Sequence, residues 1–122
     1  MLLNKFFYIL DSEQTENDLK VKISFNPEHD IFKGHFPDMP VVPGVCQVQI
    51  LKETLSNLFS RNFFVSTASS IKFLSVIEPL KTKELTMNIK LVNQDSNKLF
   101  VSADYQNGTE TYFRFKGELS EG

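Results

Sequence analysis

His35 stands in GHFPDMPVVPG, residues 34–44, a stretch with three prolines that runs directly into an apolar segment. An imidazole titrates near neutral pH, so it can take or give a proton during a reaction. Each proline fixes one backbone torsion angle, which restricts the loop that carries the ring. The stiffness of this stretch therefore predicts a preorganised site of proton transfer, although a single histidine more commonly caps a loop or fills a core pocket.

A helix is predicted directly after this loop, within residues 41–60. Pro43 suits its first turn, where a missing N–H costs nothing. Apolar residues recur at steps of three and four, the spacing of one helix face, at Gly44, Val48, Leu51, Leu55 and Leu58. Further apolar side chains lie outside this stripe at Val45, Cys46, Ile50 and Phe59. We therefore expect a partner subunit as well as a sheet to cover the helix, which makes the protein at least a dimer.

Strands are predicted on both sides of the helix. Residues 19–25, 83–92 and 98–105 alternate apolar with polar side chains, and residues 110–116 are aromatic and typical of a strand. Residues 62–80 are predicted as one long strand ending near Pro79, and a first strand is predicted from near Asn4. Asn107-Gly108 is a strong hairpin signal. The pattern predicts one α+β domain over residues 1–122, with a single long helix packed on a twisted antiparallel sheet.

Composition and charge exclude several classes of protein. The chain has 122 residues and a net charge of −2, without the basic cluster that a nucleic-acid-binding protein carries. The apolar start reaches Asp11 too soon to span a membrane. One cysteine, Cys46, allows no internal disulfide and indicates a reducing, cytoplasmic compartment. His29, His35 and Cys46 match no zinc-site spacing, so we expect no metal.

The motif resembles a known family. Residues 30–51 resemble the signature of the hot-dog-fold 3-hydroxyacyl-acyl-carrier-protein dehydratases of fatty-acid synthesis, and residues 70–91 resemble a strand pair of the same family. The positions that fall at the family's spacing are Gly34, His35, Phe36, Pro37, Pro40, Pro43, Gly44 and Val45. The resemblance implies a hot-dog fold and elimination of water from a 3-hydroxyacyl thioester. It implies no cofactor beyond the phosphopantetheine arm of acyl carrier protein, which is the expected partner.

Such an elimination needs a base, an acid and donors for the growing oxyanion. The resemblance assigns His35 as the base. The amides of Gly44 and Val45 suit the oxyanion because the first amides of a helix are unpaired and lie at its positive end. The resemblance implies a catalytic carboxylate 14 residues after the histidine, contributed across the dimer interface to the partner's histidine. That position holds Gln49 in this chain. An amide cannot give a proton to a leaving hydroxyl.

Three alternatives stay open at this point. Glu53, one helical turn after Gln49, could replace the acid. A different hot-dog subunit could supply the acid in a heterodimer, in which this chain has no turnover of its own. Gln49 could instead orient the substrate or a water, an arrangement that also suits hot-dog thioesterases.

Other residues receive simpler interpretations. Carrier protein is acidic, so a basic rim is expected from Lys33, Lys52, Arg61 and Lys72. Cys46 is interpreted as a small apolar residue and His29 as a solvated loop residue. Four apolar residues are interpreted as core ahead of acyl-tunnel lining: Phe32, Phe36, Phe73 and Leu74.

Overall fold

The computed structural model describes residues 1–34, 39–95 and 97–122. The elements are β1 (Phe7–Thr15), β2 (Asp18–Phe25), α1 (Asp30–Gly34), α2 (Gly44–Phe59), β3 (Phe63–Phe73), β4 (Glu84–Asp95), β5 (Lys98–Asn107) and β6 (Glu110–Glu121). Within the described ranges, neither helix has the length and hydropathy needed to cross a bilayer.

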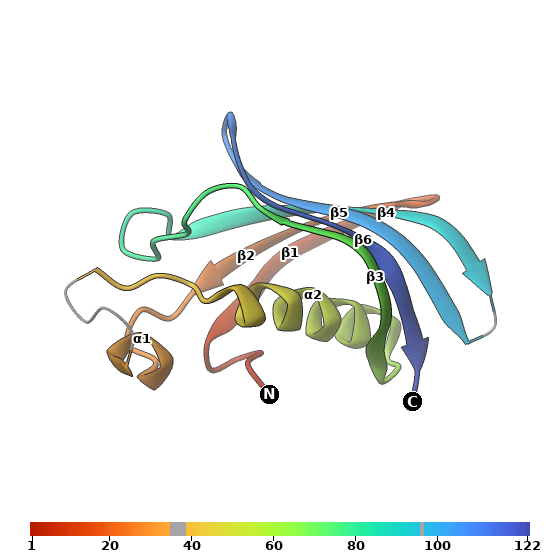
Figure 1. Ribbon diagram of the computed structural model, residues 1–122, viewed down its shortest axis with the longest axis horizontal. Helices are drawn as coiled ribbons and strands as arrows, with labels where there is room; N and C mark the ends of the chain where they lie inside the picture. The colour runs from red at the N-terminus through yellow and green to blue at the C-terminus, as the bar shows by residue number, and fades with distance from the viewer. Residues whose placement is uncertain (35–38, 96) are drawn as a thin grey trace.

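All six strands form one antiparallel sheet in the order β1-β2-β4-β5-β6-β3. The sheet arches over α2, which lies in its hollow (Figure 1). Strands β1 and β3 are therefore the two edges of the sheet, and β3 follows α2 directly in the chain. The predicted α+β architecture, with one long helix on a twisted antiparallel sheet, is confirmed.

The alternation of side chains decides which face of the sheet meets the helix. In β2, Leu19, Val21 and Ile23 are buried while Lys20 and Lys22 are exposed. The same rule holds along the next two strands, where the inward residues are Leu85, Met87, Ile89, Leu91, Leu99, Val101, Ala103 and Tyr105. The period of two read from the sequence therefore places one apolar face on the helix and one polar face outward.

The buried face of α2 differs from the predicted stripe. Leu51 and Leu55 are fully buried as expected, but Val48 and Leu58 are only partly buried. Three polar residues of α2 are also buried: Gln47, Glu53 and Thr54. Gln47 Nε2 donates to the Val42 carbonyl at 3.1 Å and Thr54 Oγ1 lies 3.8 Å from Met87 Sδ, but Gln47 Oε1 is buried without a partner among the described residues. Apolar spacing alone could not find a face that includes buried polar groups.

Two strand boundaries were predicted wrongly. Strand β1 begins at Phe7 and not near Asn4, because Asn4 has a positive φ of 69° and its amide donates to the Phe7 carbonyl in a tight turn. Strand β3 ends at Phe73 and not near Pro79. After it, the amides of Leu74 and Ser75 both donate to the Tyr112 carbonyl, and the chain leaves the sheet edge.

Helix α1 was not predicted at all. His29 precedes it, and its Nδ1 accepts a hydrogen bond from the Ile31 amide at 3.1 Å, as a residue at a helix start does. The His29 ring also packs edge-on against Phe6, with 5.3 Å between ring centroids. His29 is thus a half-buried capping residue, and its interpretation as a solvated loop residue was wrong.

Candidate functional site

The start of α2 presents free amides. Pro43 precedes the helix in an extended conformation and provides no side-chain cap. Its carbonyl accepts from the amides of Cys46 and Gln47, at 3.0 and 3.1 Å. The amides of Gly44 and Val45 have no acceptor among the described residues. They lie at the positive end of the helix and are available to a developing negative charge.

A groove of about 410 Å³ lies beside these amides; we call it the α2 groove. It is lined by residues 41–44, Gln47 and residues 73–76. The ring of Phe73 contacts Gly44 so closely that a Cβ at Gly44 would lie 2.9 Å from Phe73 Cζ. Glycine therefore permits this approach, since a Cβ here would make the Phe73 ring shift, and an aromatic ring from the end of β3 borders the free amides.

Two residues interpreted as core are instead surface residues of this groove. Phe73 is 54% exposed and Leu74 is 48% exposed, because they stand where β3 leaves the outer edge of the sheet. Phe32 is buried, as expected of a core residue, and stacks on Phe6. Phe36 lies outside the described residues.

Gln49 faces away from the sheet. It lies one turn after Val45, which is 78% exposed, so the two share a helix face. Gln49 Nε2 donates to Glu53 Oε2 at 2.7 Å. A carboxylate only accepts hydrogen bonds, which fixes the orientation of the amide; its oxygen has no donor among the residues that the structure describes. At this position the chain presents an acceptor and no acidic proton.

Glu53 is committed to the N-terminal segment. Its carboxylate accepts from the Leu2 amide at 2.8 and 3.0 Å and from the Leu3 amide at 2.8 Å, and it is 3% exposed. Burial raises the pKa of Glu53, but the hydrogen bonds from Leu2, Leu3 and Gln49 outweigh burial and hold the pKa below its usual value. A carboxylate that stays ionised near neutral pH is poorly suited to replace the family's acid.

His35 lies outside the described residues, so its distance from the α2 amides stays a prediction. The flanking residues are described: Gly34 ends α1, and Pro40 is buried shortly before α2 begins. His35 therefore falls in the sequence between the end of α1 and the start of α2, where the free amides lie.

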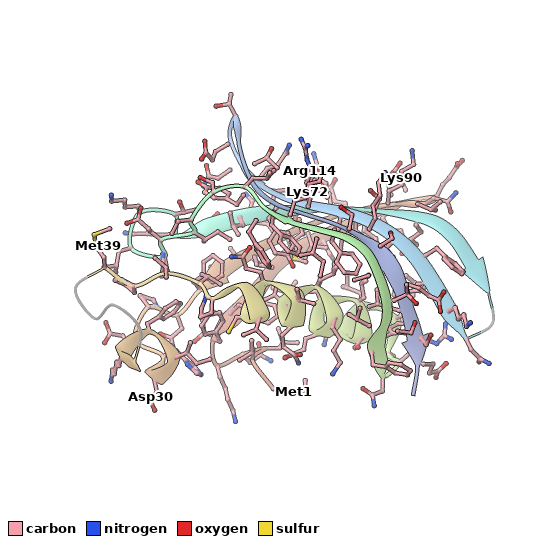
Figure 2. The ribbon with its side chains drawn as sticks, in the orientation of Figure 1. Met1, Asp30, Met39, Lys72, Lys90 and Arg114 are labelled. Carbon is pink, nitrogen blue, oxygen red and sulfur yellow. The ribbon has the colours of Figure 1, made fainter. Side chains whose placement is uncertain are left out.

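The four cations predicted as a basic rim are not brought together. Lys33 lies 3.7 Å from Asp30 on α1, and Lys52 is on α2. Arg61, beyond the opposite end of α2, pairs with Glu121 at 2.6 Å and packs over Phe63. Lys72 lies on the outer face of the sheet beside Arg114 (Figure 2).

Cys46 is buried, and burial raises the pKa of its thiol, in keeping with its interpretation as a small apolar residue. In the described part of the chain, no three His, Cys, Asp or Glu side chains gather as a metal would require.

Sequence comparisons point to one family. A family profile described as ApeI dehydratase, of the ApeI-like type, matches residues 11–114. The chain is 24% identical over 114 residues to the 3-hydroxyacyl-(acyl-carrier-protein) dehydratase FabZ of Rhodospirillum rubrum, covering 93% of this chain and 67% of that protein.

Solved structures share the fold. The dehydratase heterocomplex ApeI:P of Xenorhabdus doucetiae has a TM-score of 0.70 at 23% identity, covering 92% of this chain and 96% of its own. A thioesterase of Haemophilus influenzae has a TM-score of 0.63 at 14% identity, covering 95% of this chain and 78% of its own. The predicted hot-dog fold is thereby confirmed, and it is shared by dehydratases and thioesterases.

Proposed function

The chain belongs to the ApeI-like dehydratase family, and on this premise we propose that it acts in the elimination of water from a 3-hydroxyacyl thioester carried by acyl carrier protein. The product is a trans-2-enoyl thioester. The free amides beside the α2 groove are the observation that carries this proposal.

The reaction assigns a role to each group at this end of α2. His35 takes the proton from C2 of the acyl chain. The thioester oxygen gains negative charge as that proton leaves, and the amides of Gly44 and Val45 donate to it. The C3–O bond then breaks, the C2=C3 double bond forms, and the departing hydroxyl needs a proton to leave as water.

The proton donor for that hydroxyl is the part this chain lacks. The Gln49 amide cannot release a proton, and the hydrogen bonds to Glu53 keep the pKa of that carboxyl low. We therefore assign the acid to a partner hot-dog subunit whose carboxylate faces His35 of this chain. The related ApeI:P structure is itself a dehydratase heterocomplex.

The edge strand β3 and the start of α2 expose an apolar surface that a partner subunit could cover. Strand β3 is an edge of the sheet, and several apolar side chains of β3, the segment after it and the α2 start are 39–78% exposed: Ile71, Phe73, Leu74, Val76 and Val45. An apolar edge strand of this length invites pairing with another chain. Association there would bring a second subunit next to the α2 groove.

Assays of the purified chain on a 3-hydroxyacyl carrier thioester test the proposal. The wild-type chain alone should be slow, and Gln49→Glu should raise the rate by about 10²–10⁴-fold if it restores a general acid. The new carboxylate would lie against Glu53, so the pair would share a proton and the pKa of one member would rise, as an acid requires. His35→Ala should abolish the gain, while Lys52→Gln on the same helix should leave it unchanged. Fast turnover by wild type that survives His35→Ala would refute the proposal.

A thioesterase is the second candidate, favoured by the thioesterase neighbour in structure and by the free Gln49 oxygen, which could accept from an attacking water. The same assay separates the two, because a thioesterase releases free thiol and a dehydratase leaves the thioester intact.

A further inference from the structure

The outer face of the sheet carries a group of cations on two neighbouring strands. Lys72 on β3 lies directly opposite Arg114 on β6, and Lys116 follows on the same face of β6. We call these three residues the cationic patch. Figure 2 shows Lys72 and Arg114 together on the side of the sheet that faces away from α2. Like charges directly opposite each other on neighbouring strands are destabilising, so the stability of the fold does not explain why Lys72 and Arg114 are paired.

No ion pair joins this patch to a carboxylate within the described residues. Asp104 lies opposite Arg114 on β5 and lines the same hollow, but its Oδ1 accepts from Asn88 Nδ2 at 2.9 Å and it forms no ion pair with Arg114. The ion pairs in the described part of the chain involve other cations, as in Lys98 with Glu118 at 3.4 Å. The patch is therefore a region of net positive charge on a chain whose net charge is −2.

The patch borders an apolar hollow. A hollow of about 350 Å³ is lined by the three cations together with Ser70, Ser102 and Asp104. A second hollow of about 380 Å³ shares Ser102 and Lys116 with it and is also lined by Val92 and Phe100. Val92 is 65% exposed. The two hollows form one surface with a cationic end and an apolar end.

We propose that this outer surface docks an acidic protein that presents an apolar side chain beside its carboxylates, namely the carrier that delivers the acyl thioester. The inference rests on the proposed function for the identity of this partner. A membrane surface or a nucleic acid presents negative charge over a wide area, which would repel the acidic remainder of the chain. A small acidic protein contacts the three cations and the apolar hollow without contacting the acidic remainder of the chain.

Binding of an acyl carrier protein in its apo form tests docking without the phosphopantetheine arm or any turnover. The variant Arg114→Glu/Lys116→Glu should bind the apo carrier at least about tenfold more weakly than wild type does. Val92→Ala should also bind the apo carrier more weakly than wild type. Lys20→Glu is the matched control, because Lys20 lies on the same face in a hollow with Glu13 and Asp18. Lys20→Glu should bind like wild type.

Equal affinity of wild type and Arg114→Glu/Lys116→Glu for the apo carrier would overturn the docking proposal, whether or not the chain proves to be a dehydratase. So would stronger binding to anionic phosphatidylglycerol vesicles than to the carrier. If turnover is found, the charge-reversal variant should raise KM for carrier-bound substrate and leave KM for an N-acetylcysteamine thioester unchanged. Absence of turnover even in Gln49→Glu, with intact, patch-dependent carrier binding, would refute the proposed reaction alone.

Discussion

The two long faces of α2 differ in where their side chains find partners. On the face toward the sheet, Leu51 and Leu55 are fully buried, and Gln47 and Thr54 make contacts within the chain, although Gln47 Oε1 is buried without a partner among the described residues. On the opposite face, Val45 is largely exposed, and Gln49 Oε1 has no donor in the described part of the chain. The inner face is thus buried within this chain, whereas the outer face leaves apolar surface exposed. The difference indicates that the site at the start of α2 is completed by a second chain.

The largest expected effect of a substitution is on the inner face. Leu51→Ala should lower the free energy of unfolding by about 2–5 kcal/mol, because it leaves a cavity under the helix. Val45→Ala, on the outer face, should change the free energy of unfolding by less than about 0.5 kcal/mol but should weaken subunit association. Urea denaturation at fixed protein concentration measures the free energy of unfolding of each variant. Sedimentation measures its subunit association. An equal loss of unfolding free energy in both variants would contradict the distinction between the two faces of α2.

Glu53 is the one carboxylate that ties the helix to the N-terminal segment. Glu53→Gln should cost about 1–3 kcal/mol at pH 7, since hydrogen bonds to a charged acceptor are replaced by weaker ones. Because the folded pKa of Glu53 is depressed, the ionised carboxylate stabilises the fold above its unfolded pKa of about 4.3, and this stability is lost as the pH falls through the folded pKa. Denaturation between pH 7 and pH 3 should therefore show a shallower acid-side loss in Glu53→Gln. An unchanged pH profile would contradict the assignment.

Gly44→Ala should have a small effect on stability and a clear effect on the groove. Alanine favours the helix by about 1 kcal/mol over glycine, while its Cβ displaces the Phe73 ring, so the net change in unfolding free energy should stay within about 1 kcal/mol. Phe73→Ala should remove the conflict. A double-mutant cycle should give a coupling of at least about 0.5 kcal/mol between the two positions, and additive effects would show that the ring does not press on Gly44.

Much of the fold could be predicted because strand alternation is local. The residues of β2, β4 and β5 that point inward follow directly from a period of two, and Gly108 adopts the positive φ of 60° that the Asn107-Gly108 turn predicts. The helix was found for the same reason, although its buried face includes polar residues whose contacts, such as that of Thr54 with Met87, apolar spacing does not reveal. Helix α1 was missed because it is short and its cap is a histidine, which is not among the residue types that signal a helix start in a sequence.

The candidate site was predicted only in part. The free amides of Gly44 and Val45 follow from helix geometry and needed no tertiary information. The ring of Phe73 against Gly44 depends on where an edge strand ends, which no local pattern specified. The commitment of Glu53 to the amides of Leu2 and Leu3 depends on residues about 50 positions away, so the spacing from Gln49 could suggest a substitute acid but not exclude it.

A complementation experiment tests most directly whether the site is shared between chains. The variant His35→Ala/Gln49→Glu lacks the base, and the wild-type chain lacks the acid, so each alone should be slow. Refolded together, they should dehydrate a 3-hydroxyacyl thioester at least about 10²-fold faster than the sum of the separate rates, since His35 of one chain then meets Glu at position 49 of the other. A mixture no faster than that sum, with Gln49→Glu active on its own, would place the whole site within one chain and contradict the account.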